Sequence, residues 1–368
     1  MAEGTHFFTI DHLLSGICVR LQLTKTQYWS AEEHYLSIGG VLSEKPSPLA
    51  PLVIRIYPQG SMALETTVKP RDEEEFDLDL ILLFGRWLAG PVDLRNAVIE
   101  RLRQDARYRD RLDLRFPRCI RVNYAGQFHL DVVPARVDVQ RGGTAIEVPD
   151  KGSSRWMPND PLKYKALFDA ASKYVILEKA AQDPLPLLIS SDDKPPLKRA
   201  VQLLKRHRDV VFKGASTAPS SMVLTTLAAR YYRAESSVAE ALQSILKSIL
   251  RDAQLASPGR MSLPNPGNDG ECLMREWTDE RYNQFIGFVS NFAASIDRLL
   301  AQAGSGLPAI GSELKKLFDE EGTITNSVLN EFAKSIQEQR LAGQLKATTS
   351  GLALGVGRTI PRNTHYGR

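Results

Sequence analysis

Residues 60–84 read GSMALETTVKPRDEEEFDLDLILLF, and this stretch decides how the rest of the chain is interpreted. The run from Phe76 to Phe84 is apolar enough for a buried strand, yet it contains Asp77 and Asp79. Side chains two positions apart point to the same face of a strand, so the two carboxylates should lie together, opposite three leucines. Because neighbouring carboxylates are costly to bury without a cation between them, the stretch predicts a divalent metal site.

A third acidic residue extends this pattern. The strand predicted at 127–137 carries Asp131 among apolar residues. If that strand pairs beside the first, Asp131 can complete a cluster with Asp77 and Asp79. Three hard oxygen donors suit Mg²⁺ or Mn²⁺, and such a cluster commonly supports catalysis by two metal ions.

Gly60 and Ser61 add a turn that can bind phosphate ahead of the acids. A glycine lets the backbone approach a phosphate closely, and a serine offers its hydroxyl. Taken singly, a Gly-Ser turn, an exposed acidic pair and one hydrogen-bonded aspartate are ordinary structural features. Their order along the chain, with both acidic strands otherwise apolar, favours a site for a nucleoside triphosphate.

Composition narrows the class of protein. A chain of 368 residues favours two packed lobes over one domain. Its net charge of +4 permits a polyanionic partner without indicating one, and its three distant cysteines argue against a disulfide framework or a cysteine-rich zinc site. The sequence shows no apolar run of transmembrane length and no signal peptide, so we expect a cytoplasmic protein without a membrane partner.

The pattern of residues predicts three regions. Residues 1–195 should form an α/β core with N-terminal helices, and 183–196 has the composition of a linker. Residues 196–341 should form a helical lobe, and 342–368 a flexible tail rich in Gly and Thr. Within the helical lobe, helices are expected at about 196–213, 220–233, 235–253, 278–302, 309–320 and 324–341.

Four stretches together resemble the DNA polymerase β-type nucleotidyltransferase superfamily. They are GSMALETTV with FDLDLIL, FHLDVVPA, LLKRHRDVV leading into PSSMVLTTLAA, and LPNPGNDGECLMREW. More narrowly, the chain resembles the bacterial CD-NTases, relatives of cyclic GMP-AMP synthase and oligoadenylate synthase, over residues 8–340. The resemblance implies an α+β fold, in which a mixed, largely antiparallel nucleotidyltransferase sheet is joined to an oligoadenylate synthase-like helical lobe.

The resemblance also implies roles for individual residues. The three aspartates would bind two Mg²⁺ ions, with Mn²⁺ as an alternative, and Asp131 would help to activate the attacking ribose hydroxyl. Five residues would hold the triphosphate: Gly60, Ser61, Lys205, Ser220 and Ser221. From the residues alone, Lys205 could be a solvated lysine on a basic helix and Ser220 a helix N-cap.

Three less specific positions follow from the same comparison. The loop at 263–272 would connect helices on the active-site side of the helical lobe. The base-contacting residues are expected between 147 and 160, around Trp156 and Asn159. Trp277 is predicted to lie in the core rather than to stack on a base.

The implied activity is Mg²⁺-dependent synthesis of a cyclic di- or trinucleotide from nucleoside triphosphates, ATP among them, in anti-phage (CBASS) signalling. The implied partners are an E1/E2-like conjugating enzyme acting on the C-terminal tail, or a HORMA-type activator. A nucleic-acid activator is disfavoured because no zinc insertion or basic stripe with interleaved aromatics is present. Two alternatives stay open: a transferase that makes linear oligonucleotides or modifies RNA or protein, and a non-catalytic module acting through its tail.

Overall fold

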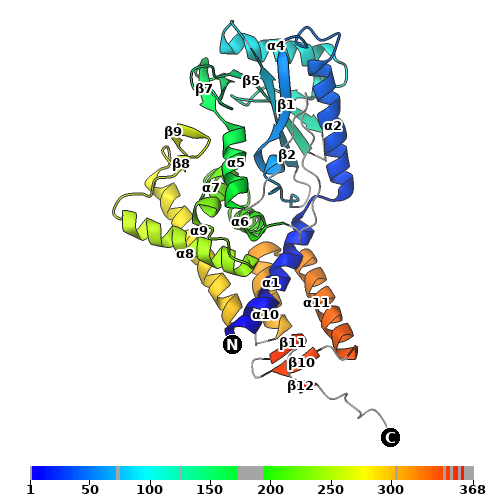
Figure 1. Cartoon of the computed structure of the whole chain (residues 1–368), viewed down its shortest axis with the longest axis vertical. Helices are drawn as coiled ribbons and strands as arrows, with labels where there is room; N and C mark the ends of the chain where they lie inside the picture. Colours follow the sequence, from blue (N-terminus) through cyan, green and yellow to red (C-terminus); the bar gives the residue numbers. More distant parts are fainter. Residues whose placement is uncertain are drawn as a thin grey trace.

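A mixed sheet lies at one end of the molecule and a bundle of helices at the other (Figure 1). The computed structural model describes residues 2–71, 75–85, 87–124, 126, 128–172, 194–302, 306–342, 345–348, 351–354 and 358–359. The predicted linker at 183–196 lies mostly outside these residues. The expected α+β fold, with a sheet that carries the acids and a separate helical lobe, is confirmed.

The sheet places the two acidic strands at its centre. Five strands run in the order β1 (Val53–Gln59), β2 (Phe76–Phe84), β5 (Phe128–Val137), β4 (Ile120–Tyr124) and β3 (Leu112–Asp113). β6 (Ile146–Asp150) pairs with β5, and β7 (Arg155–Asn159) with β6. Only β2 and β5 pair in parallel among the described strands of this sheet. The carboxylates therefore lie on neighbouring strands that run in the same direction.

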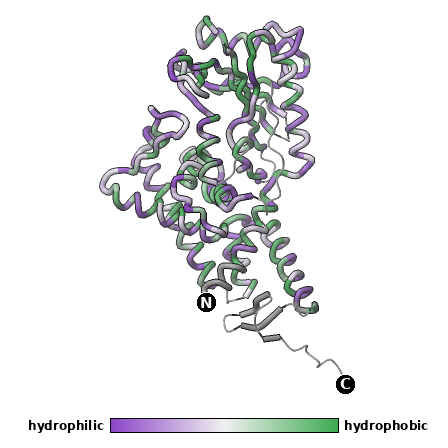
Figure 2. The backbone as a smooth tube through the Cα atoms, in the orientation of Figure 1, coloured by the Kyte–Doolittle hydropathy of each residue, from purple (hydrophilic) through white to green (hydrophobic). Residues whose placement is uncertain are grey.

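Helices α2 (Lys25–Ser43) and α4 (Pro91–Gln104) pack against one face of this sheet. Every second residue of β2 points into that core, and the leucines at 78, 80 and 82 are fully buried there. The alternation predicted for this strand is confirmed, since the intervening positions, including both aspartates, face the opposite side. Hydrophobic residues gather along the central strands in Figure 2. One face of the sheet is therefore packed against α2 and α4, and the acids lie on the other face beside a smaller apolar cluster that includes Ile81 and Val133.

The helical lobe follows the predicted pattern closely. The six predicted helices are α6 (Pro196–Phe212), α7 (Ser221–Tyr231), α8 (Val238–Ala256), α9 (Asp279–Ala301), α10 (Leu307–Phe318) and α11 (Thr323–Leu341). Helix α5 (Pro161–Ala171), which the prediction placed within the core region 1–195, buries Tyr164 and Phe168 in the same apolar cluster as these helices. Ser237 and Thr278 cap α8 and α9 by accepting hydrogen bonds from backbone N–H groups in the first turn. Trp277 lies in the apolar core of this lobe, as predicted.

The N-terminal helix α1 (Ala2–Leu21) packs differently from the expectation, which grouped it with the catalytic core. Its apolar stripe, including Leu13, Leu14 and Ile17, is buried in the same cluster as side chains of α6 and α8. The reason is tertiary, because an amphipathic helix buries its stripe against whichever neighbour offers an apolar face. The helical lobe is therefore built from both ends of the chain.

Part of the predicted tail forms strands. β10 (Leu345–Thr348) pairs antiparallel with β11 (Gly351–Leu354) and β12 (Arg358–Thr359). The end of the predicted tail, 360–368, lies outside the described residues. Among the described helices, none combines the length and the apolar character needed to cross a membrane.

Candidate functional site

The two acidic strands bring the predicted carboxylates together. In the parallel pairing of β2 with β5, Asp79 lies directly opposite Asp131, and Asp77 lies opposite His129. Paired residues of neighbouring strands project from the same face of the sheet, so all three acids lie on the face opposite α2 and α4. Asp131 is nearly buried, with 6% of its surface exposed.

Gly60 brings the backbone against the middle acid. β1 ends at Gln59, which pairs with Asp79, and the short helix α3 (Gly60–Ala63) begins at the next residue. The φ angle of Gly60 is +64°, and a Cβ atom there would lie 2.4 Å from Oδ2 of Asp79. The positive φ angle therefore favours glycine at this position, and any side chain would force the carboxylate of Asp79 or the turn to move.

A lysine of the helical lobe contacts the loop that follows α3. Lys205, on α6, donates hydrogen bonds from Nζ to the backbone oxygen of Thr66 at 3.1 Å and to its Oγ1 at 3.0 Å. Thr67 donates from its hydroxyl to the hydroxyl of Ser61 at 3.2 Å. The predicted phosphate-binding turn and the predicted lysine therefore meet across the two lobes.

A cavity of about 360 Å³ opens between the lobes at this point. Its volume falls within the range of about 300–1,000 Å³ that is typical of small-molecule sites. Its lining combines sheet residues with residues of the helical lobe, among them Gln59, Gly60, Ser61, Asp77, Asp79, Asn159, Lys165, Lys205, Ser221 and Asn265. Most of the predicted site residues therefore border one cavity.

The two predicted serines occupy different places. Ser221 lines the cavity, and its hydroxyl accepts a hydrogen bond from Nη1 of Arg208 at 3.0 Å. Ser220 is the N-cap of α7, where its hydroxyl accepts from the backbone N–H of Val223, and it is not among the lining residues. The prediction named both serines, and the structure brings only Ser221 to the cavity.

The loop predicted to lie on the active-site side of the helical lobe forms a small hairpin of β8 (Pro264–Asn265) and β9 (Asn268–Cys272). Gly267 at its tip approaches the catalytic lobe so closely that a Cβ would lie 2.7 Å from the backbone oxygen of Asp160. Asn268 donates a hydrogen bond from Nδ2 to the backbone oxygen of Pro158 at 3.2 Å. The hairpin thus closes one side of the cavity.

Of the two residues expected near the base, only Asn159 lines this cavity. Trp156 instead packs against the guanidinium of Arg136, whose Cζ lies 4.0 Å from the centre of the ring. A base-contacting role stays a prediction for Asn159, and the observed packing gives Trp156 a structural contact outside the cavity lining.

Burial shifts the pKa values of two groups that line the cavity, Asp79 and Lys205. Desolvation, together with the charges of Asp131 and Asp77, raises the pKa of Asp79 to about 7. Desolvation, with a smaller contribution from Arg208, lowers the pKa of Lys205 to about 7. Both groups therefore resist their charged forms, which is common where a site is arranged to bind an ion or perform chemistry.

Two basic residues beside the acids were missed in the sequence analysis. Arg121, on β4, donates from Nε and Nη2 to the two carboxylate oxygens of Asp131, each at 2.8 Å. Its Nη2 also donates to Oδ1 of Asp77 at 3.0 Å, and Nδ1 of His129 lies 3.3 Å from the same oxygen. For Arg121, the available signal was a basic residue between the buried apolar positions of a short strand. Its partner, Asp131, could be identified only from the strand register.

The donor set suits a hard divalent cation. Carboxylates are the ligands that Mg²⁺ and Mn²⁺ prefer, and three of them lie on one sheet face, with Asp77 and Asp79 lining the cavity. Burial, followed by the charges of Asp131 and Asp77, raises the pKa of Asp79, and a bound divalent cation would favour its charged form. Within the part of the chain that the structure describes, no three acidic, His or Cys side chains stand close enough to hold a metal as they are placed. The residue types fit the ion, and the Asp131 carboxylate is engaged by Arg121.

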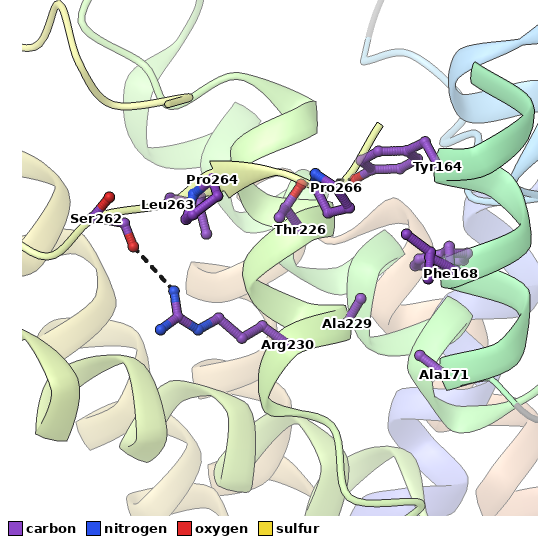
Figure 3. Close-up of a pocket in the computed structure, with 11 residues that line it drawn as sticks. Tyr164, Phe168, Ala171, Thr226, Ala229, Arg230, Ser262, Leu263, Pro264 and Pro266 are labelled. Atoms are coloured by element: carbon purple, nitrogen blue, oxygen red, sulfur yellow. Dashed lines mark hydrogen bonds between the residues drawn. The ribbon is translucent and has the colours of Figure 1, made fainter. Parts of the chain in front are cut away.

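A second cavity of about 510 Å³ is lined by α5, α7 and the segment at 262–266 (Figure 3). Its walls are largely apolar and include Phe168 and Leu263, with Arg230 donating to the backbone oxygen of Ser262 at 3.0 Å. Tyr164 borders both cavities, and its hydroxyl lies 2.8 Å from that of Thr226. The larger cavity contains none of the predicted site residues, so we assign the chemistry to the smaller one.

Comparison with known proteins agrees with this geometry. Residues 9–171 match the model of the Second Messenger Oligonucleotide or Dinucleotide Synthetase domain. A c-di-GMP synthase from Roseivirga ehrenbergii is 33% identical over 77% of each chain. The cyclic dinucleotide synthase CdnG of Bradyrhizobium diazoefficiens is 24% identical over 96% of this chain and 89% of its own.

Solved structures show the same fold. The CdnG structure in complex with GTP matches with a TM-score of 0.71 and 21% identity, covering 87% of this chain and 97% of that one. The cyclic AMP-GMP synthase DncV of Vibrio cholerae, with a nonhydrolyzable GTP, matches with a TM-score of 0.56 and 15% identity over 88% and 89% of the two chains. The chain therefore belongs to the bacterial CD-NTases, nucleotidyltransferases that build cyclic oligonucleotides from nucleoside triphosphates.

Proposed function

We propose that this CD-NTase condenses two GTP molecules into cyclic di-GMP, releasing two pyrophosphates. The chemistry rests on one observation: Asp77, Asp79 and Gly60 line a cavity that both lobes border, and Asp131, which is not among the lining residues, pairs with Asp79 on the neighbouring strand. The choice of guanine is supported by the relative named a c-di-GMP synthase and by the similar CdnG structure that contains GTP.

In this proposal the carboxylates of Asp77, Asp79 and Asp131 hold Mg²⁺, or Mn²⁺. When bound, the ions would lower the pKa of the attacking ribose hydroxyl and offset the charge that develops on the triphosphate. In this proposal, Asp131 helps to activate the attacking oxygen, the role that the family resemblance implies for it. The absence of a side chain at Gly60 keeps the backbone close to Asp79.

The phosphate-binding part consists of Ser61, Lys205 and Ser221, which border the cavity from both lobes. In each of two condensations, the ribose oxygen forms a bond to the α-phosphorus of the donor. The bond from that phosphorus to the β-phosphate oxygen breaks, and pyrophosphate leaves while the hydroxyl proton is lost. Lys205 stabilises the charge on the leaving group.

The proposed setting is anti-phage signalling, the role implied by the family resemblance. The proposed compartment is the cytoplasm, because the nucleoside triphosphates consumed are cytoplasmic metabolites. A HORMA-type activator is supported by the fold similarity to Escherichia coli CdnC, whose complex with a HORMA protein has been solved and matches with a TM-score of 0.58. ATP as a second substrate and an E1/E2-like enzyme acting on the tail stay predictions, and residues 360–368 of that tail lie outside the described part of the chain.

Product analysis tests this function. The purified protein would be incubated with Mg²⁺ and each nucleoside triphosphate alone and in pairs, then treated with phosphatase and examined by mass spectrometry. We expect GTP alone to suffice and its product to survive phosphatase with the mass of a cyclic guanine dinucleotide. A product that loses terminal phosphates would indicate a linear oligonucleotide, and a mixed product would contradict the proposed guanine specificity.

Triphosphate binding should weaken as the pH rises above about 7. Because burial lowers the pKa of Lys205 to about 7, the free protein holds this amine increasingly neutral above that pH. A bound triphosphate favours the charged amine and raises its pKa, so binding must take up a proton. The dissociation constant of a nonhydrolysable GTP analogue should therefore rise by up to about tenfold per pH unit above 7.

The variant Lys205→Met supplies the comparison for that measurement by isothermal titration calorimetry. It should bind weakly, and the pH dependence that remains should be that of the nucleotide and of Asp79, whose pKa is also about 7. Lys213→Met, which removes an exposed lysine after the same helix, should behave like the wild type. A pH profile in Lys205→Met as steep as that of the wild type would contradict the assignment.

A further inference from the structure

Arg121 occupies an unexpected position among the carboxylates. It pairs with Asp131 across the antiparallel β4–β5 ladder, and its guanidinium contacts both oxygens of that carboxylate and one oxygen of Asp77. The ring of Phe116 supports the guanidinium, with Cζ 4.2 Å from the ring centre. The arginine side chain is 16% exposed and that of Asp131 is 9% exposed, so water screens this pair weakly.

A bidentate guanidinium uses the same carboxylate oxygens that a divalent ion would need. Two parallel N–H···O hydrogen bonds from one guanidinium to one carboxylate are among the stronger charge-assisted hydrogen bonds in proteins. Asp131 therefore has a cationic partner from the chain itself, and Asp77 shares it. The three acids, although in register, do not converge as ligands among the described residues, and two of them are engaged by this guanidinium.

We propose that Arg121 is a positioning residue that occupies the cation position between Asp131 and Asp77 and is displaced when a divalent ion binds. This inference rests on the proposed function, in which the three aspartates hold the metal. The arginine offsets the repulsion among the acids in the metal-free protein. The ion must compete with it, so metal binding is weak until a nucleotide triphosphate supplies further oxygen ligands.

Binding of Mn²⁺, measured by electron paramagnetic resonance without nucleotide, tests this displacement independently of turnover. Arg121→Gln removes the competing cation, and we expect its Mn²⁺ dissociation constant to fall at least tenfold. Arg121→Lys keeps the charge but loses the bidentate geometry, and its constant should fall by several-fold. In both variants, adding a nonhydrolysable GTP analogue should improve Mn²⁺ affinity less than it does in the wild type.

Arg115→Gln is the matched control, because Arg115 makes a similar fork with Asp113 and its side chain is 87% exposed. It should leave Mn²⁺ binding unchanged. If Arg121→Gln binds Mn²⁺ more tightly while Arg121→Lys matches the wild type, the arginine acts only through its charge and displacement is wrong. Unchanged or weaker binding in both variants would make Arg121 a permanent partner of Asp131, which also overturns the inference.

The same titration separates this inference from the proposed function. Asp79→Asn should weaken Mn²⁺ binding strongly if the aspartates are the metal site. If Asp79→Asn binds as the wild type does, the metal site itself is misassigned. Should Arg121→Gln fail to fold, the charge-conserving Arg121→Lys decides between the outcomes.

Discussion

Replacing Asp79 with asparagine should reduce nucleotide turnover by about 1,000-fold or more while the fold is retained. Asp79 is the central acid: it lies opposite Asp131, next to Gly60 and two residues from Asp77. Asparagine has nearly the same shape but no charge, so the site would lose a metal ligand without losing its packing. Pyrophosphate release under saturating GTP and Mg²⁺ gives the measurement.

Stability distinguishes this loss of ligand from a loss of fold. Burial and the neighbouring acids raise the pKa of Asp79 to about 7, so ionising it in the metal-free folded protein costs free energy. Asparagine lacks that cost, and the melting temperature of the metal-free variant at neutral pH should be equal to or above that of the wild type. Asp113→Asn, outside the cavity, should leave turnover unchanged. Turnover in Asp79→Asn within tenfold of the wild type would refute the central role of this carboxylate.

Replacing Gly60 with alanine should lower kcat by about 100-fold or more, since displacing a catalytic group by about 1 Å can have an effect of that size. The added Cβ would fall 2.4 Å from Oδ2 of Asp79, which real structures do not tolerate. Either the carboxylate or the turn that carries Ser61 must move. The measurement is again pyrophosphate release, with Mn²⁺ affinity as an independent readout of where Asp79 has gone.

Gly142 serves as a control that separates the effect of a side chain at positive φ from the effect of the close contact with Asp79. Gly142 has a φ angle of +66°, close to the +64° of Gly60, but a Cβ there would meet nothing within 4 Å. Gly142→Ala should therefore show the backbone cost of alanine at positive φ with normal turnover. Equal activity losses in the two variants, or normal activity in Gly60→Ala, would show that the close approach to Asp79 does not matter.

The sequence predicted the acidic strand because its evidence is local. Alternation along β2 is a property of an extended backbone, so two aspartates one residue apart share a face wherever the strand lies. The helices from α6 to α11 were predicted from apolar periodicity and capping residues, which also act within a few turns. The Gly60–Ser61 signal was equally local, although the structure alone shows that Asp79 is what forbids a side chain there.

Other features depended on which segments meet. The sequence could not show that α1 packs in the helical lobe, because its apolar stripe fits more than one partner. It could not choose between Ser220 and Ser221, since one residue along a helix start decides whether a hydroxyl caps the helix or faces the cavity. Part of the tail forms strands, and strand pairing depends on contacts between segments.

The sequence by itself determined which types of residue the site offers, because the carboxylates, glycine and serine that suit a metal and a phosphate, and the strand periodicity that groups the acids, are local properties of the chain. Tertiary structure decided how the acids are paired, how far Lys205 is buried and which basic residue contacts the carboxylates. It set Asp131 opposite Asp79, lowered the pKa of Lys205 by burial and placed Arg121 on the carboxylates. Register, burial and opposing charge arise only between strands and lobes that are far apart in the sequence, so none of them could be read from residues 60–84 alone.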